Sequence, residues 1–197
     1  DNVNWTDIPG ATSVDYLPGP ISQTTYFRYA LTSTSGEKGA YSQSHAITIN
    51  QPDPNEFGNN QWIANVYDGS NFDNYNGRFT LNTTSIDLAN ALGNDLNSPQ
   101  SINGYSGCDP GTDYWSVSFK RTNWDCGQYD FHLAAWDDNV QIRFDYDGDG
   151  TWDDTSTNYT CCSTTGDVHW YPVLNANSKV EVRFSEATGN ALLQLNI

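Results

Sequence analysis

The chain has 197 residues, and its 24 acidic against 8 basic residues give it a formal net charge of −16. This charge repels phosphate backbones and anionic lipid headgroups, which argues against nucleic acid and membrane surfaces as partners, whereas cations are attracted. The lack of Met and the abundance of Asn, Thr, Ser, Tyr and Trp are typical of extracellular β-proteins, and no apolar run approaches the ~20 residues of a membrane span.

The first 50 residues predict only three strands, one around Trp5, one over residues 26–31 and one over residues 45–49. Three strands bury too little apolar surface to be comfortably stable alone. Residues 4–12 (NWTDIPGAT) and 24–28 (TTYFR) resemble the repeats of giant surface proteins of gliding and adhesive Bacteroidota-type bacteria. The resemblance implies that this region is the end of an immunoglobulin-like repeat of a bacterial adhesin, whose first strands would lie upstream.

Residues 51–59 are expected to form a linker. Pro52 and Pro54 cannot donate to a sheet ladder, and the residues around them carry no apolar side chain that would pack. We therefore expect a partial immunoglobulin-like repeat over residues 1–50 and a second domain over residues 60–197.

Alternation of apolar and polar residues marks the strands of the second domain. Apolar side chains recur with a period of two residues in five segments, which are residues 116–120, 129–135, 140–145, 180–184 and 193–197. Such segments, separated by Gly, Asn and Asp clusters, are typical of an antiparallel β-sandwich. Helical periodicity is confined to residues 85–92, where we expect a turn or two of helix. The sequence therefore predicts an all-β fold.

The turn after the third of these strands is rich in aspartate. A D-x-D-x-D-G pattern ending at Gly150 places carboxylates at alternate positions, and a further carboxylate follows: Asp145, Asp147, Asp149 and Asp153. Calcium takes about six to eight oxygen ligands, and loops with this pattern wrap it well. Ser156 stands where an EF-hand has Glu, so Asp153 or Asp154 would close the shell instead. The alternative is that these aspartates are ordinary solvated turn residues.

Residues 60–197 contain four features whose order along the chain is informative. They are the pattern Y-x-F-x-L from Tyr129, a corner at Asp137 and Asp138, the acidic turn, and the C-terminal run VEVRFSEATGNALLQL. This order resembles the PA14 domain, a β-sandwich module of toxins, yeast adhesins, glycosidases and bacterial surface proteins. In lectin members of that family, two consecutive aspartates joined by a cis peptide hold a calcium ion that also contacts sugar hydroxyls. The resemblance assigns this role to Asp137 and Asp138; the acidic turn here is longer than the family's short I-D-G.

Three residues near these acidic positions are candidates for contact with a sugar. Trp136 precedes the aspartate pair, Asn139 follows it, and Trp152 lies inside the acidic turn. Aromatic faces stack on sugar rings. An exposed tryptophan in a polar loop therefore indicates a contact with a ligand or partner. The tryptophans on predicted strands are instead expected in the core: Trp62, Trp115 and Trp170.

No arrangement in the sequence points to catalysis. The three histidines accompany no nucleophile motif, and no H-E-x-x-H occurs. A glycosidase needs a carboxylate pair across a cleft, but Glu181 alternates outward on a strand and Glu186 is interpreted as a turn residue. We therefore predict that the protein is not an enzyme.

The four cysteines predict disulfides, because they do not form the paired C-x2-C knuckles of a zinc site. Three pairings are open. A bond between the neighbours Cys161 and Cys162 would be strained, so we expect Cys108 and Cys126 to pair with each other or outside the chain.

Together these observations predict a calcium-dependent, carbohydrate-binding, lectin-like adhesion module of a large secreted bacterial surface protein. Ca²⁺ is the expected cofactor. The expected partner is an extracellular or cell-surface glycan, or neighbouring copies of the same surface protein. The alternative is a calcium-stabilised structural module of a surface stalk or filament, in which protein oxygens fill every position around the ion.

Overall fold

The computed structural model describes residues 3–13, 15–19, 21, 24–48, 52–88 and 98–197. The chain divides into two compact units, Asp1–Pro52 and Asp53–Ile197. Within the described ranges, no helix has both the length and the apolar character needed to cross a membrane.

The first unit contains four short strands in two antiparallel pairs, which are β1 (Thr25–Phe27) with β4 (His45–Ile47) and β2 (Ala30–Thr32) with β3 (Lys38–Tyr41). The predicted strand around Trp5 is wrong, since residues 3–8 adopt no strand. The Trp5 ring instead lies 4.1 Å from the guanidinium of Arg28, which also lies 4.0 Å from the Tyr41 ring. Cation–π stacking thus holds this segment, and stacking of that kind leaves no period-two signal.

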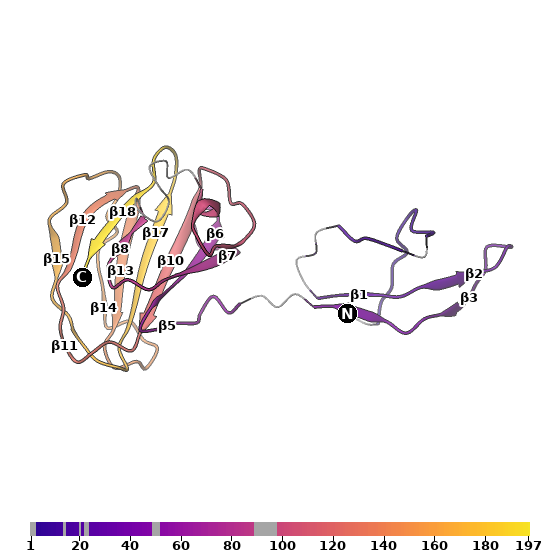
Figure 1. Ribbon diagram of the computed structural model, residues 1–197, viewed down its shortest axis with the longest axis horizontal. Coiled ribbons are helices and arrows are strands. Elements are labelled where there is room, and N and C mark those ends of the chain that lie inside the picture. Colours follow the sequence, from indigo (N-terminus) through magenta and orange to yellow (C-terminus); the bar gives the residue numbers. More distant parts are fainter. Residues whose placement is uncertain (1–2, 14, 20, 22–23, 49–51, 89–97) are drawn as a thin grey trace. The chain divides into compact units, whose positions relative to one another are not determined.

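The second unit is a sandwich of two sheets (Figure 1). The larger sheet has the order β14-β13-β17-β10-β6-β7-β9, with β5 pairing parallel to β10 and all other neighbours antiparallel. Its strands are β5 (Gly58–Asn59), β6 (Trp62–Asp68), β7 (Asn74–Leu81), β9 (Ser106–Gly107), β10 (Trp115–Thr122), β13 (Asn139–Asp145), β14 (Asp154–Thr155) and β17 (Lys179–Glu186).

The smaller sheet has the order β15-β12-β18-β8. Its strands are β8 (Ile86–Asp87), β12 (Phe131–Asp137), β15 (Val168–Trp170) and β18 (Leu192–Asn196). Two short elements, β11 (Gly127–Gln128) and β16 (Val173–Leu174), form a separate pair, and residues Pro99–Ser101 form one turn of 3-10 helix.

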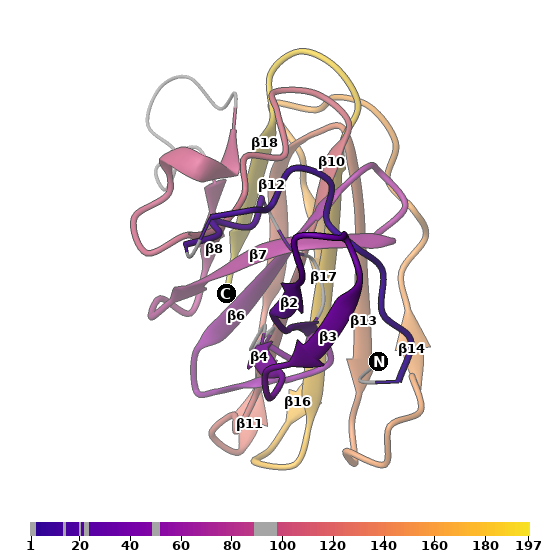
Figure 2. The ribbon, with the colours of Figure 1, turned by 90° about the vertical axis from the view of Figure 1, so that its right-hand side faces the viewer.

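Period-two alternation decides which side chains fill the sandwich. On β10, Val117 and Phe119 are buried in the core, so Ser118 and Lys120, which alternate with them, lie on the opposite face of the sheet. The strands β6, β10, β17 and β13 run side by side with the same alternation (Figure 2). The predicted strands of the second unit and the all-β antiparallel fold are therefore confirmed.

Two segments differ from the sequence expectation or add to it. Residues 53–59 are held against the larger sheet, because the Pro54 carbonyl accepts hydrogen bonds from Lys120 Nζ at 3.0 Å and Asn65 Nδ2 at 3.1 Å. The helical turn expected over residues 85–92 is wrong for Ile86–Asp87, which form β8 against β18. The residues of that stretch from 89 onward lie outside the described part of the chain.

Candidate functional site

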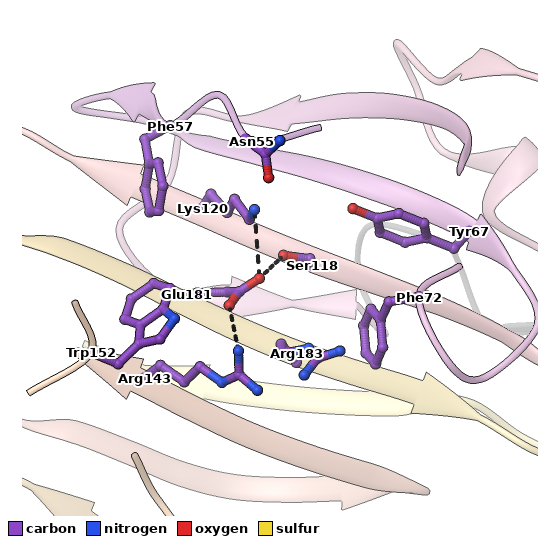
Figure 3. Close-up of a pocket in the computed structure, with 10 residues that line it drawn as sticks. All are labelled: Asn55, Phe57, Tyr67, Phe72, Ser118, Lys120, Arg143, Trp152, Glu181 and Arg183. Atoms are coloured by element: carbon purple, nitrogen blue, oxygen red, sulfur yellow. Dashed lines mark hydrogen bonds and ion pairs between the residues drawn. The ribbon is translucent and has the colours of Figure 1, made fainter. Parts of the chain in front are cut away.

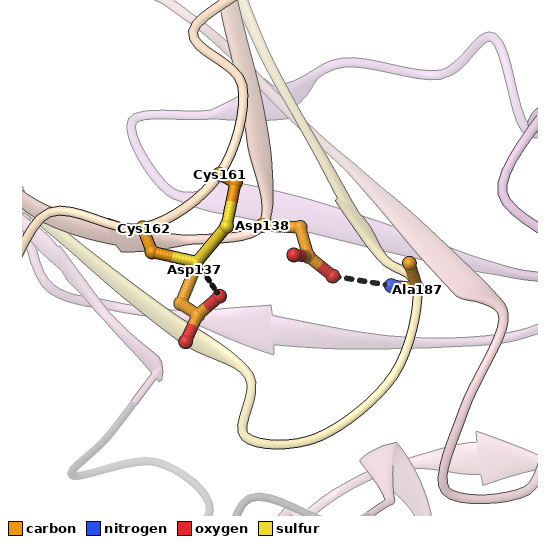
Figure 4. Close-up of a disulfide and its surroundings, with 5 residues drawn as sticks. All are labelled: Asp137, Asp138, Cys161, Cys162 and Ala187. Atoms are coloured by element: carbon orange, nitrogen blue, oxygen red, sulfur yellow. Dashed lines mark hydrogen bonds between the residues drawn. A yellow bond between two sulfur atoms is a disulfide. The ribbon is translucent and has the colours of Figure 1, made fainter.

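The Asp137–Asp138 corner joins the two sheets of the sandwich. Strand β12 ends at Asp137 in the smaller sheet, and β13 begins at Asn139 in the larger one. The peptide bond between the two aspartates is cis, as the resemblance to PA14 domains implies. Asp138 Oδ2 accepts a hydrogen bond from the backbone N–H of Ala187 at 2.7 Å (Figure 4). The loop after β17 thereby fixes the second carboxylate of the corner.

The carboxylates of the corner converge. One oxygen each of Asp137 and Asp138 and the sulfurs of Cys161 and Cys162 lie within 4.8 Å of one another. The sulfurs are bonded to each other and offer no thiolate, so the two carboxylates are the hard ligands of the group. Partial burial, and next the negative charge of Asp138, raise the pKa of Asp137. Both effects mean that a cation between the two oxygens would be favourable.

A third carboxylate, which the sequence places in a turn, lies buried next to this corner. Glu186 is the last residue of β17, is fully buried, and pairs in register with Trp115. Neither carboxylate oxygen of Glu186 has a hydrogen-bond partner in the described structure. Burial, and then the charges of Asp138, Asp137 and Asp113, raise the pKa of Glu186 to about 7. The interpretation of Glu186 as a turn residue is therefore wrong.

Among the described residues, the acids at this end of the sandwich form no ion pairs. Within the described part of the chain, no Lys, Arg or His forms an ion pair with Asp113, Asp137, Asp138 or Glu186. A signal for Glu186 was present in the sequence, because it continues the inward alternation of Val180, Val182 and Phe184. The group is a concentration of negative charge that a divalent cation would neutralise.

A polar hollow of about 330 Å³ begins beside the corner. Asn139, which follows the aspartate pair, and Ser185, which precedes Glu186, both line it, and Asn139 Nδ2 donates to Ser185 Oγ at 3.2 Å. Phe72 and Arg183 also line it, and amides and hydroxyls make up the rest of its wall: Ser70, Asn71, Gln141 and Asn158. Of the three residues expected to contact a sugar, Asn139 is thus placed next to the corner.

The two tryptophans expected to contact a sugar do not line this hollow. Trp136 is a residue of β12 whose half-buried ring packs edge-on against Tyr159 at 5.6 Å, so it is not an exposed platform. The polar sequence that follows Trp136 made it look like a loop residue. Trp152 lines a different hollow, on the outer face of the larger sheet, where its ring lies 6.3 Å from that of Phe57.

The acidic turn is organised by hydrogen bonds from its own backbone. Asp145 is almost fully buried; its Oδ1 accepts the Gly148 N–H at 2.6 Å and its Oδ2 the Gly150 N–H at 2.9 Å. Lys179 Nζ lies 3.4 Å from Asp145 Oδ2 and donates to the Gly148 carbonyl at 2.6 Å. Burial acts to raise the pKa of Asp145, but these N–H donors and Lys179 outweigh it and lower that pKa.

The other aspartates of the turn behave similarly. Asp147 and Asp149 each accept a backbone N–H two residues on, and Asp153 Oδ2 accepts the N–H of Tyr146 at 2.7 Å. Oxygens of Asp145, Asp147 and Asp149 nevertheless lie within 4.8 Å of one another. This spacing is compatible with both sequence interpretations, a calcium loop and a hydrogen-bonded turn.

Replacing Lys179 with Met is expected to separate these interpretations. Among the described residues, Lys179 is the one basic side chain that pairs with an aspartate of this turn. Lys179→Met leaves the buried Asp145 charge without a cation and should lower the free energy of unfolding by about 1–3 kcal/mol in EGTA. Lys179→Arg, which keeps the charge, should lose less. We expect calcium to restore most of the loss in urea titrations; no restoration would leave the aspartates as turn formers only.

The expectation that Cys161 and Cys162 do not bond to each other is wrong, as is a bond between Cys108 and Cys126, whereas their pairing outside the chain stays a prediction. Cys161 and Cys162 form a disulfide, and Cys108 and Cys126 are free and exposed. Both bonded cysteines adopt positive φ angles, 26° and 62°, so the chain bends sharply and the two sulfurs meet. In a regular strand or helix, the sulfurs of two neighbouring cysteines would point apart. No pattern in the sequence predicts this bend.

Two stacked histidines form a third group of possible ligands. His132 on β12 and His169 on β15 lie with ring centroids 4.2 Å apart and nearly parallel. His169 Nδ1 is 2.7 Å from Asp130 Oδ1, and its Nε2 is 3.1 Å from Asp167 Oδ1. The bond to Asp130, and then the bond to Asp167, raise the pKa of His169. When it is protonated, the ring thus ties the edge strand β15 to its neighbour β12.

This geometry predicts a pH-dependent contribution to stability. Because the folded pKa of His169 lies above its unfolded value, its contribution is complete below the unfolded pKa of about 6.5 and disappears as the pH rises through the folded value. His169→Asn should therefore lower the melting temperature more at pH 5.5 than at pH 8.5. Equal losses at both pH values would contradict this assignment.

Comparisons with known proteins bear on both units. Residues 1–51 match a family model described as a domain of unknown function (DUF8696). No curated protein matches the chain. Three solved structures resemble it with TM-scores of 0.46, 0.45 and 0.44 and sequence identities of 8%, 13% and 13%.

The first of these structures is a subtype-switched Epithelial Adhesin 9 to 1 A domain from Candida glabrata in complex with β-lactose; the likeness covers 68% of this chain and 78% of that one. The second is a PA14 sugar-binding domain from an RTX adhesin (68% and 86%), and the third is the PA14 domain of the MpAFP antifreeze protein (75% and 86%). At these identities, each resembles the chain in its arrangement of strands.

Proposed function

We propose that this chain is a calcium-dependent carbohydrate-binding module, and that the Asp137–Asp138 corner holds the ion. The observation that carries the proposal is the gathering of Asp137, Asp138 and the fully buried, unpartnered Glu186 at one end of the sandwich, without a basic partner among the described residues. Buried carboxylates are costly when unpaired, and calcium prefers several carboxylate oxygens.

A calcium ion at this corner would neutralise charge and would also bind sugar hydroxyls directly. Its coordination number of about six to eight exceeds the oxygens that two or three carboxylates supply, so positions are left for vicinal hydroxyls of a sugar. The hollow that begins at Asn139 and Ser185 offers amide and hydroxyl groups for the remaining sugar hydroxyls. In this arrangement the ion supplies affinity and the amides orient the ring.

The test is a glycan panel probed by isothermal titration with the full chain, once with calcium and once with EGTA. We expect binding of at least one neutral glycan with calcium and at least a hundredfold weaker binding with EGTA. Calcium binding without any glycan response would favour the rival function, a calcium-stabilised structural module of a stalk or filament. Neutral-glycan binding that EGTA does not alter would overturn the calcium dependence.

Several wider expectations stay predictions. They include a second ion in the acidic turn, the immunoglobulin-like character of the first unit, self-association between neighbouring copies, the lack of catalysis, and an extracellular, bacterial setting. The turn is tested by Lys179→Met as above. The others follow from the composition and from the resemblances of the sequence.

A further inference from the structure

The outer face of the larger sheet carries a second hollow, of about 320 Å³, which we name the outer groove. Side chains that alternate away from the sandwich core form its floor on β10, β17 and β13: Lys120, Glu181, Arg183 and Arg143 (Figure 3). Aromatic rings stand at its two ends, Trp152 at one and Phe72 at the other. None of the acids of the Asp137–Asp138 corner lines the groove, but Phe72 and Arg183 line both the groove and the polar hollow beside that corner.

The groove is positively charged in a strongly acidic chain. Three basic residues and one acid line it, so its net charge is +2, whereas the whole chain carries −16. Tyr67 adds a hydroxyl but no charge, because burial, and then the charge of Glu181, raise its pKa to about 12. A local field of the opposite sign to the rest of the surface favours an anionic ligand at this place.

Glu181 is already satisfied by its neighbours. Its carboxylate accepts the Ser118 hydroxyl at 2.6 Å and lies 3.4 Å from Arg143 and 3.7 Å from Lys120 (Figure 3). The oxygens of Glu181 are thereby bonded on both sides. Within the described part of the chain, the one acid of the groove therefore forms ion pairs with Lys120 and Arg143 and none with Arg183, the third cation.

Among the described residues, no side chain or backbone carbonyl accepts a hydrogen bond from the Arg183 guanidinium. Within the described part of the chain, its guanidinium forms neither a hydrogen bond nor an ion pair, and its one contact of note is the Phe72 ring, 3.9 Å away. Burial, and then the charge of Arg143, lower the pKa of Arg183, and they outweigh the opposing effect of the nearby Glu181. A half-buried guanidinium beside an aromatic ring keeps its N–H donors available to a ligand that enters the groove.

A purely structural role explains part of this arrangement. Lys120 lies over the Phe57 ring at 5.5 Å and Arg143 lies 6.0 Å from the Trp152 ring, so cation–π contacts support both side chains. These two cations also hold Glu181. Such a role does not explain Arg183, whose donors remain open although carboxylates are plentiful in the chain.

We propose that the outer groove binds a carboxylated sugar residue, with its carboxylate on the Arg183 fork and its ring between the aromatic walls. A planar carboxylate matches the two parallel N–H groups of a guanidinium. The apolar faces of a pyranose suit Phe72 and Trp152, and a volume of about 320 Å³ is at the small end of ligand sites, which is the scale of one sugar residue. The site needs no calcium and goes beyond the proposed function.

The test uses the full chain in EGTA, where the Asp137–Asp138 corner is empty of calcium. Methyl β-glucuronide, methyl β-glucoside and inorganic phosphate are titrated and followed by amide chemical shifts. We expect the glucuronide to bind at least tenfold more tightly than either of the others, with shifts on β10, β13 and β17. Equal affinities for the glucuronide and the glucoside would overturn the proposal. Equal affinities for the glucuronide and phosphate would also overturn it, because they would reveal a general anion site.

Two variants and a control complete the test. Arg183→Gln should weaken glucuronide binding at least tenfold, and Phe72→Ala, which keeps the charge, about fivefold. Arg78→Gln changes the net charge equally but lies outside the groove, where Arg78 pairs with Glu56 at 2.7 Å, and should bind as wild type. A wild-type melting temperature would show that Arg183→Gln folds. If its melting temperature is lower, Phe72→Ala provides the test instead. Wild-type affinity in a folded Arg183→Gln would exclude the site.

Discussion

The double variant Asp137→Asn, Asp138→Asn is expected to lose the response to calcium. Both substitutions keep the shape of the corner but remove two negative charges that would ligate the ion. If the wild type is saturated at about a hundredfold excess of calcium over Kd, binding stabilises it by about 3 kcal/mol, which the variant forfeits. The measurement is the melting temperature in calcium and in EGTA, together with glycan titration in calcium.

A matched control is Asp73→Asn, an exposed residue that lines neither hollow. It removes a negative charge without touching the corner and should melt and bind as wild type. In EGTA the double variant should be at least as stable as wild type, because repulsion between neighbouring carboxylates is gone. A calcium response of wild-type size in the double variant would place the ion elsewhere.

The second large effect concerns Glu186 in the calcium-free protein. Its folded pKa of about 7 lies above the unfolded value of 4.5, so the folded state binds the extra proton between these pH values. Stability is therefore complete below about pH 4.5 and falls as the pH rises through 7, by roughly 3 kcal/mol in total. Glu186→Gln, neutral at every pH, should remove this decline and be more stable than wild type at pH 8.5 in EGTA.

The measurement is urea unfolding at pH 5 and pH 8.5, with EGTA and with calcium. Calcium should reverse the order at pH 8.5, because the ion stabilises the ionised Glu186 that the variant lacks. Glu56→Gln, an exposed substitution, is the control for the loss of one charge and should follow the wild-type profile. An unchanged decline in Glu186→Gln would mean that another group titrates.

The strands and the corner were predictable because their signals are local. Alternation of apolar and polar residues over β10, β13 and β17 is a period-two pattern that needs no knowledge of neighbours. The same pattern extends to Glu186, but the Gly and Asn that follow it suggested an earlier turn. Glu186, two residues after Phe184, continues the alternation of side chains that point into the sandwich.

Other parts of the site depend on pairing between distant segments. Lys179 reaches Asp145 because the two residues are partners in the register of β17 and β13. The same register sets Arg143 opposite Glu181, and β10 sets Lys120 opposite it from the other side. The alternation shows that these side chains face outward, but it does not show which strands are neighbours. The outer groove was therefore invisible in the sequence.

The account is tested most directly by a crystal structure of the full chain grown with calcium and a glycan that it binds. We predict one ion between the carboxylates of Asp137 and Asp138, with two sugar hydroxyls completing its shell and the ring directed toward Asn139. Folded protein with no ion at this corner, or with an ion there whose ligands are all protein oxygens, would contradict it.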